Sequence, residues 1–298
     1  MTSNLPPITI GIPFYNAEAT LLDAVRSVFV QTHQNWELIL LDDGSTDRSL
    51  ELARSIKDPR VKVYSDGQNK RLAARLNQIP GLATHDYLAR MDADDLISPV
   101  RIERQLSLLV RRPELDLVST GICSLTDKNE PLGVRCTAEN FRLVPRNVLA
   151  GKAGIVHASL VGSKAWFIRN QYRENLKSSE DANLWIRAYS KGDLAVGFVN
   201  APLYYYREDG NVVLSKLATA YREGIRTILK DSGEGYSSMD KIYAYSLTAT
   251  KLIVANAFAA IGSLELLRKR RNGQILSSIE EENLREEIEY IRNFKLPQ

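Results

Sequence analysis

Cysteine is scarce in this chain of 298 residues, since Cys123 and Cys136 are the only two. So few thiols argue against a disulfide framework and favour a reducing compartment. Long apolar runs are also lacking, and no stretch reaches the roughly 20 residues that a transmembrane helix needs. The first residues show no basic segment followed by an apolar one, so no signal peptide is predicted and a cytoplasmic location is expected.

An excess of charge of one sign is missing as well. The 39 Lys and Arg residues nearly balance the 36 Asp and Glu residues, which leaves a formal net charge of +3. That charge is too small to indicate nucleic acid as a partner. The contents of 44% hydrophobic and 25% charged residues are ordinary for a globular protein, and no repeat or low-complexity segment is seen.

Short apolar runs alternate with amphipathic segments over roughly the first hundred residues. Strands are predicted at 8–12, 36–41, 61–64 and 87–91, and helices at 17–31, 48–56, 70–79 and 99–111. Such alternation predicts a mostly parallel sheet with helices on both faces. The pattern becomes irregular after residue 119, with one clear helix predicted at 180–189.

Beyond about residue 213 the chain predicts almost only helix. The expected helices are 214–229, 240–267 and 277–294, separated by glycine-containing breaks. We therefore predict an α/β domain at 1–211 and a helical C-terminal region at 212–298.

Three carboxylates, Asp92, Asp94 and Asp95, follow the strand predicted at 87–91. Carboxylates this close repel one another unless a cation lies among them. A hard divalent ion with oxygen ligands is the candidate, and such ions usually bind together with a phosphate-bearing ligand. In an extended backbone Asp92 and Asp94 point the same way, so one can hold a metal while the other holds a ribose hydroxyl. The alternative is a solvated acidic turn.

Pro13 and Asp43 likewise lie just past the carboxyl ends of predicted strands. Ligands of such sheets bind at the carboxyl ends of the strands, so we expect these residues to meet Asp92 at one edge. Asp43 can accept a hydrogen bond from a uracil imide N–H or from a ribose hydroxyl. The alternative is an Asx turn that caps the next helix.

These features belong to a larger set of short motifs, which occur at residues 12–16, 28–32, 42–47, 71–77, 92–95, 157–161 and 180–185. In residues, order and spacing they resemble family 2 of the nucleotide-sugar glycosyltransferases, over roughly the first two-thirds of the chain. The resemblance implies a GT-A (Rossmann-like) fold: a mostly parallel mixed sheet flanked by helices, here with a C-terminal helical extension. It also implies an inverting, metal-dependent transfer of a sugar from a nucleoside diphosphate donor, with UDP as the expected nucleotide.

The resemblance further implies a role for each matching residue. The donor base, ribose and diphosphate would be held by Pro13, Tyr15, Asp43, Arg71 and Asp92, with Arg75 nearby. Asp94 of the DxD motif would coordinate Mn²⁺ or Mg²⁺ bridging the diphosphate. The alternative for Arg71 and Arg75, four residues apart on one helix face, is a solvated basic surface.

An inverting transfer needs a carboxylate that takes the acceptor proton from the face opposite the leaving group. The resemblance assigns this role to Asp181, at the start of the predicted helix 180–189, where the helix dipole favours its ionised form. Glu180 is the rival base, and a merely structural charge at the helix end is the alternative. His157 is expected either at the diphosphate or metal or in a structural position, and Trp185 either on a sugar ring or in the core.

The apolar stretch 252–264 is followed by the basic residues 268–271. Together they predict peripheral contact of 252–271 with an anionic membrane surface, which would suit a lipid-linked acceptor. The alternative is packing on the catalytic domain or on a second subunit in a homodimer. A glycan or lipid-linked acceptor in bacterial surface polysaccharide synthesis is expected from the resemblance. A sugar-nucleotide pyrophosphorylase and a non-catalytic binding or scaffold protein are the alternative functions.

Overall fold

The computed structural model describes residues 5–208, 214–260 and 276–297. Its centre is a nine-stranded mixed sheet in the order β3-β2-β1-β4-β8-β6-β9-β5, with β7 paired to β6. The strands are β1 (Ile8–Phe14), β2 (Trp36–Asp42), β3 (Val61–Ser65), β4 (Tyr87–Arg90), β5 (Leu96–Ile97), β6 (Leu117–Leu125), β7 (Pro131–Arg135), β8 (Val161–Ser163) and β9 (Val196–Arg207).

The first four strands run parallel, as predicted, and their carboxyl ends share one edge. The second half of the sheet, which the sequence pattern left irregular, brings in antiparallel pairs through β8, β7 and β5. Strand β1 does not end before Pro13 as predicted but continues to Phe14. Pairing with β4 stops at Gly11, so Pro13 lies where β1 has β2 alone as a ladder partner and a missing N–H is tolerated.

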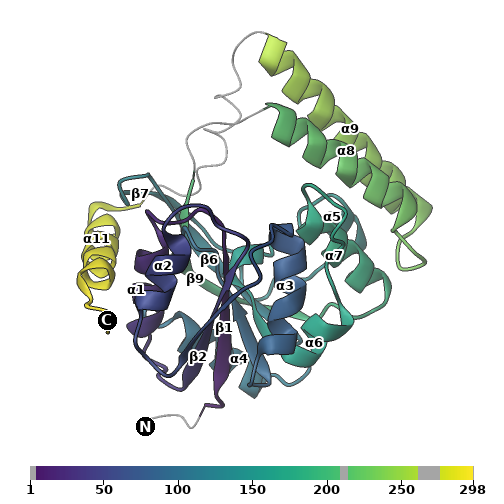
Figure 1. Ribbon diagram of the computed structural model, residues 1–298. Helices are drawn as coiled ribbons and strands as arrows, with labels where there is room; N and C mark the ends of the chain where they lie inside the picture. The colour runs from purple at the N-terminus through teal and green to yellow at the C-terminus, as the bar shows by residue number, and fades with distance from the viewer. Residues whose placement is uncertain (1–4, 209–213, 261–275, 298) are drawn as a thin grey trace.

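Helices cover both faces of the sheet (Figure 1). They are α1 (Leu21–Phe29), α2 (Ser49–Ser55), α3 (Arg71–Leu82), α4 (Arg101–Arg111), α5 (Pro145–Leu149), α6 (Lys164–Arg169) and α7 (Glu180–Ser190). Helices α1, α2 and α4 bury apolar side chains against one face, where Ile10 and Leu38 lie. Helices α3, α6 and α7 cover the other face, around Ile39 and Leu41. This two-sided burial explains why the strands read as continuous apolar runs.

The C-terminal helices pack in two different ways. Helices α8 (Leu214–Lys230) and α9 (Ser238–Ala260) form a hairpin that stands out from the body and contacts α5 and α7 (Figure 1). Helix α11 (Ser278–Asn293) instead lies against α1, with Ile288 and Ile291 buried beside Tyr205. The predicted boundary after residue 211 lies outside the described residues, as do 261–271 of the apolar and basic stretch.

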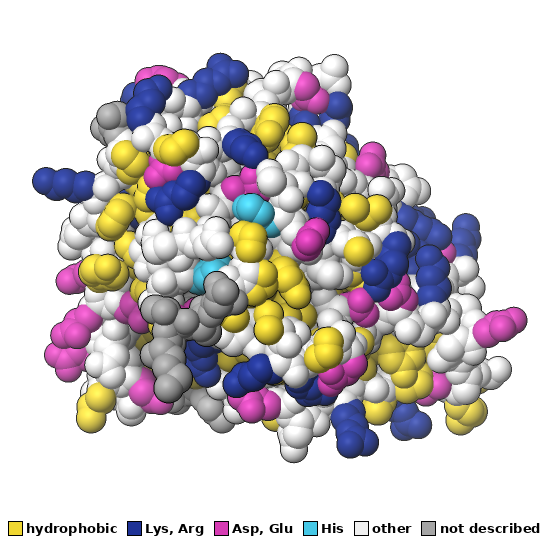
Figure 2. All heavy atoms as spheres, turned by 90° about the horizontal axis from the view of Figure 1, so that it is seen from below, with side chains coloured by type: hydrophobic (Ala, Val, Ile, Leu, Met, Phe, Trp, Pro, Cys, Tyr) yellow, Lys and Arg dark blue, Asp and Glu magenta, His cyan; other side chains and the backbone are white. Residues whose placement is uncertain are grey.

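The surface carries charges of both signs side by side. On the face seen in Figure 2, Lys and Arg side chains lie among Asp and Glu, with hydrophobic side chains between them. Of the helices within residues 5–208, 214–260 and 276–297, none is both long and apolar enough to span a bilayer.

Candidate active site

A cavity of about 430 Å³ opens at the carboxyl ends of β1 and β4. Its lining includes Pro13, Tyr15, Asp92, Asp94 and Tyr206. Tyr15 is 49% exposed, and Asp94 is also exposed. The volume lies in the usual range of roughly 300–1,000 Å³ for small-molecule sites. The structure thus brings four of the predicted site residues around one space.

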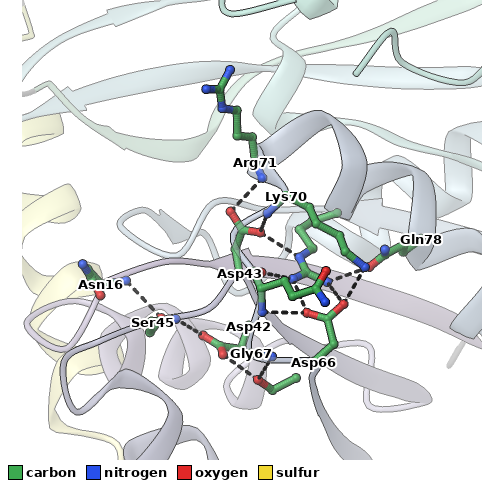
Figure 3. A network of polar contacts seen from close by, with 12 residues as sticks. Asn16, Asp42, Asp43, Ser45, Asp66, Gly67, Lys70, Arg71 and Gln78 are labelled. Atoms are coloured by element: carbon green, nitrogen blue, oxygen red, sulfur yellow. Dashed lines mark hydrogen bonds and ion pairs between the residues drawn. The ribbon is translucent and has the colours of Figure 1, made fainter. Parts of the chain in front are cut away.

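Asp43 follows β2 directly and organises the start of α3 (Figure 3). Its carboxylate accepts hydrogen bonds from the backbone N–H groups of Lys70 and Arg71, at 2.7 and 3.0 Å. The Arg75 Nε donates to the same carboxylate at 2.8 Å, and the Arg75 Nη2 donates to Asp66 at 2.7 Å. Asp43 therefore connects the end of β2 to the start of α3. Three protein donors already occupy its carboxylate, which leaves little acceptor capacity for another partner.

The two arginines of α3 do not share one role, in contrast to the basic face considered from the sequence. Arg75 is 1% exposed and lies between Asp43 and Asp66, whereas Arg71 is exposed. Figure 3 shows the Arg71 side chain pointing away from Asp43 while its backbone N–H donates to it. Arg71 has a φ of 71°, a left-handed conformation that is uncommon for a residue with a long side chain. The Arg71 guanidinium is therefore exposed, whereas Arg75 is the buried structural partner of Asp43 and Asp66.

The turns after β1 and β2 are braced against each other. The Asn16 backbone N–H donates to Ser45 Oγ at 3.1 Å, and Asn16 Oδ1 accepts from the Thr46 backbone N–H at 2.8 Å. Asp42 accepts from the Ser45 backbone N–H at 3.0 Å and from the Ser65 hydroxyl at 2.7 Å, so it braces the turn after β2 and does not cap α2. Gly44, at φ 74°, lies so near residue 68 that a Cβ there would come within 2.8 Å of the Gln68 carbonyl carbon.

The acidic loop (residues 92–95) holds its three carboxylates in different environments. Asp92 pairs with Arg90 at 2.6 Å. Asp95 is 1% exposed and accepts from the Tyr204 hydroxyl and the Arg207 backbone N–H, both at 2.8 Å. Burial, followed by the charges of Asp94 and Asp92, raises the pKa of Asp95 well above its usual range. Asp95 therefore anchors the loop, while Asp92 and Asp94 face the cavity.

The residues present fit a divalent cation that arrives with a diphosphate. Among the described residues, no group of three His, Cys, Asp or Glu side chains converges as a closed protein cage would require. Mg²⁺ is usually bound through one or two carboxylates plus substrate phosphates rather than by such a cage. Exposed Asp94, with Asp92 beside it on the cavity wall, offers that kind of site.

Asp181 is the second residue of α7, and the backbone before it is constrained. Ser179 has a φ of 59°, and the Glu223 carboxylate accepts from the backbone N–H groups of Lys177 and Ser178 at 3.1 and 2.9 Å. Burial raises the pKa of Asp181, while the Ala182 backbone N–H and the Arg90 charge oppose that rise. The helix N-terminus alone, on which the sequence prediction relied, therefore does not set its ionisation.

His157 and Trp185 occupy packed positions near the site. His157 Nε2 lies 2.7 Å from the Tyr172 hydroxyl, and burial lowers the pKa of His157 well below its usual range. Trp185 is 4% exposed, stacks on Trp166 with ring centroids 6.1 Å apart, and contacts the His157 ring edge-on. For Trp185 the structure favours the core interpretation.

Comparison with known proteins identifies the family. The sequence profile described as glycosyl transferase family 2 matches residues 9–165. The putative glycosyltransferase EpsE of Bacillus subtilis is 34% identical over 213 residues, covering 69% of this chain and 74% of EpsE. The putative teichuronic acid biosynthesis glycosyltransferase TuaG of the same organism is 28% identical over 222 residues, covering 72% of this chain and 84% of TuaG.

Two solved structures share the fold. Staphylococcus aureus TarS 1–349 in complex with UDP-GlcNAc gives a TM-score of 0.63 at 15% identity, covering 85% of this chain and 75% of TarS 1–349. The mannosyltransferase PcManGT of Pyrobaculum calidifontis, in complex with GDP-Man and Mn²⁺, gives 0.59 at 14% identity, covering 97% and 86%. The predicted GT-A fold is confirmed, and the chain is a glycosyltransferase enzyme that belongs to glycosyl transferase family 2.

Proposed function

We propose that this chain is an inverting, metal-dependent glycosyltransferase that moves a sugar from a UDP-linked donor to a glycan or lipid-linked hydroxyl in polysaccharide synthesis. The observation that carries the proposal is one cavity at the carboxyl ends of β1 and β4 that is lined by Tyr15, Asp92 and Asp94. The UDP-GlcNAc complex of TarS supports a UDP-linked donor, and the names of TuaG and EpsE support a polysaccharide setting.

In the proposed reaction the acceptor hydroxyl oxygen forms a bond to the anomeric carbon of the donor. The bond from that carbon to the diphosphate oxygen breaks, and its electron pair leaves with the nucleoside diphosphate. The acceptor proton passes to the Asp181 carboxylate, which acts as general base. Asp92 would hold the ribose and Asp43 the base. A divalent cation held by Asp94 would neutralise the charge on the diphosphate, so no protein acid is needed there.

The test of this assignment compares Asp181→Asn with Glu180→Gln. Both residues open α7, and burial raises the pKa of both, so the pair is well matched. Loss of a general base typically costs about 10²–10⁴ in rate. We expect that loss in kcat for Asp181→Asn, with the donor dissociation constant changed less than about threefold, and a milder loss for Glu180→Gln.

A larger loss of kcat in Glu180→Gln than in Asp181→Asn would assign the general base to Glu180, and wild-type rates in both variants would exclude a general base at this helix end.

The donor is tested by thermal shift with UDP-, GDP- and dTDP-sugars, with and without Mn²⁺. Stabilisation by none of them with Mn²⁺ present would contradict the proposed donor class.

The α8–α9 hairpin supports peripheral contact with a membrane that presents a lipid-linked acceptor. Its exposed apolar side chains include Met239, Ile242 and Ile253, at 72%, 59% and 69% exposed. A homodimer would cover the same side chains. Flotation with anionic liposomes at low salt tests the membrane contact, because a membrane-binding chain floats with the lipid. Size-exclusion chromatography without lipid tests the homodimer, which elutes at twice the monomer mass. A chain that neither floats nor dimerises contradicts both.

A further inference from the structure

Arg207, the last residue of β9, bonds directly to the acidic loop. Strand β9 pairs antiparallel with β5, which follows the loop, so the end of β9 lies beside Asp94 and Asp95. The Arg207 backbone N–H donates to Asp95 Oδ1 at 2.8 Å, and its Nη1 donates to the backbone carbonyl of Asp94 at 2.5 Å. The Arg207 side chain is only 10% exposed. One largely buried residue therefore contacts two consecutive residues of the loop.

The Arg207 guanidinium approaches the loop from the side away from the cavity. Tyr206 lines the cavity, and successive side chains of a strand point to opposite faces. The hydrogen bond of Arg207 goes to the main chain of Asp94, which is an exposed residue of the cavity wall. Arg207 can therefore set the place of Asp94 without filling the space of a ligand.

Two neighbours fix the orientation of the Arg207 guanidinium. Its Nε and Nη2 donate to Asn129 Oδ1, in the turn between β6 and β7, at 2.9 and 2.7 Å. Its Nη2 also lies 3.6 Å from Asp23 Oδ2 on α1. All three guanidinium nitrogens thus have defined partners. A planar fork held in this way fixes a direction, which the point charge of a lysine does not.

Helix α11 supports both of these neighbours from outside. It lies beside α1 and β7 (Figure 1). Arg292 Nε donates to the same Asp23 Oδ2 at 3.0 Å, and Arg285 forms an ion pair at 2.8 Å with Glu130, the residue after Asn129. Short chains of polar contacts therefore lead from α11 through α1 and through the β6–β7 turn to Arg207.

The place of the Asp94 main chain matters because a metal ligand has little positional tolerance. Mg²⁺ requires oxygen ligands at about 2.0–2.1 Å in near-octahedral geometry. Groups that orient the ligands of a metal typically contribute about 10–100-fold to affinity. A loop that carries three carboxylates also repels itself, and a guanidinium bonded to it offsets part of that repulsion.

We propose that Arg207 is a positioning residue of the donor site, which holds the Asp94 main chain so that the Asp94 carboxylate meets the cation and the diphosphate. Helix α11 keeps Arg207 in place through Asp23 and Asn129, so residues 278–293 belong to the catalytic unit. This inference rests on the proposed function of Asp94 as the cation ligand.

The first experiment is calorimetric titration of UDP in the presence of Mn²⁺ into wild type, Arg207→Met and Arg207→Lys. We expect the dissociation constant to rise by about 10–100-fold in Arg207→Met. Arg207→Lys keeps the charge but loses the fork, so its affinity should lie closer to that of Arg207→Met than to that of wild type. Wild-type affinity in Arg207→Lys would show that charge alone suffices and would overturn the positioning role.

Arg135→Met is the matched control. The Arg135 Nη2 donates to the Glu208 carboxylate at 2.8 Å, so this variant removes an ion pair from the residue next to Arg207. It should lower the melting temperature and leave the affinity for UDP with Mn²⁺ unchanged. An equal loss of affinity in Arg135→Met and Arg207→Met would mean that general weakening of the β9 end explains the effect, and would overturn the proposal.

The contribution of α11 is tested by Arg292→Gln, a substitution of a side chain that is 47% exposed and that should leave the fold intact. We expect a smaller rise in the same dissociation constant, because Asp23 then loses one of its partners. Wild-type affinity in Arg292→Gln would exclude α11 from the catalytic unit.

A last measurement needs neither donor nor turnover. Hydrogen exchange of a peptide that covers residues 91–97 should be faster in ligand-free Arg207→Met than in wild type, and unchanged in Arg135→Met. Unchanged exchange in a folded Arg207→Met protein would overturn the inference. A wild-type chain that does not bind UDP with Mn²⁺ would refute the proposed donor instead, and the exchange rates would still decide whether Arg207 positions the loop.

Discussion

Glu37 on β2 offers a stability prediction whose magnitude follows from its contacts. The Thr9 hydroxyl donates to one carboxylate oxygen at 2.5 Å, and Lys62 Nζ and the Thr84 hydroxyl donate to the other at 2.7 and 2.9 Å. Its side chain is 7% exposed. Burial by itself raises the pKa of Glu37, but these donors outweigh burial and bring the pKa down from 4.5 to about 2.

The folded-state pKa of Glu37 is depressed, so its contribution to stability is present above the unfolded-state pKa and is lost as the pH falls toward about 2. A shift of this size corresponds to about 3 kcal/mol at neutral pH and about half of that near pH 3. Glu37→Gln removes the charge and keeps the shape. We therefore expect the free energy of unfolding of Glu37→Gln to lie about 3 kcal/mol below wild type at neutral pH, with the gap closing in acid.

Urea denaturation of both proteins across the acidic range measures this difference in the free energy of unfolding. The contributions of the other carboxylates cancel, because both proteins contain them. Glu51→Gln is the control, since Glu51 pairs with Arg48 on the surface with both side chains 68% exposed. A solvent-screened pair of that kind contributes little to stability, so Glu51→Gln should unfold as the wild type does. Glu37 lies near the amino end of its strand, away from the cavity, so kcat should be unchanged. A gap that stays constant with pH would refute the linkage argument.

Three further substitutions test the framework of the site. Tyr204→Phe removes the hydroxyl that accepts from the Asp92 backbone N–H and donates to Asp95, so unfolding should become about 1–3 kcal/mol easier and the donor KM should rise, as measured by urea denaturation and initial rates. Wild-type values of both would show that the acidic loop does not depend on this hydroxyl. Arg75→Met leaves Asp43 without its buried partner and should cost about 3–5 kcal/mol, whereas Arg71→Met should stay within about 0.5 kcal/mol of wild type while it weakens donor binding. Equal stability of the two variants would contradict the separate roles of these arginines.

Local patterning was sufficient for the first half of the fold. Apolar runs such as 36–41 are bounded by turn residues, and the intervening helices repeat at helical spacing, so strand and helix could be assigned before any packing was known. The rule that ligands bind at the carboxyl ends of parallel strands then grouped Pro13, Asp43 and Asp92, and the structure places them at one edge. The helices at 214–230 and 278–293 were found for the same reason.

The sequence pattern could not predict which remote segments pair with each other in the sheet. Strand β6 pairs with β9, roughly eighty residues later, and β8 is inserted antiparallel beside β4. Helix α11 returns to α1, where Arg292 pairs with Asp23 at 3.0 Å. No local signal in 277–294 distinguishes a helix that packs on the body from one that stands apart, because the amphipathic spacing is the same in both cases.

The sequence by itself determined which residue types gather at the strand ends, since alternation and turn chemistry are local properties. Only the tertiary structure decided what each charge does there. It buried Arg75 between Asp43 and Asp66, left Arg71 exposed, and paired the buried Arg90 with Asp92. The reason is physical: the ionisation and partners of a side chain depend on burial and on charges brought close by folding, and neither is encoded by spacing along the chain.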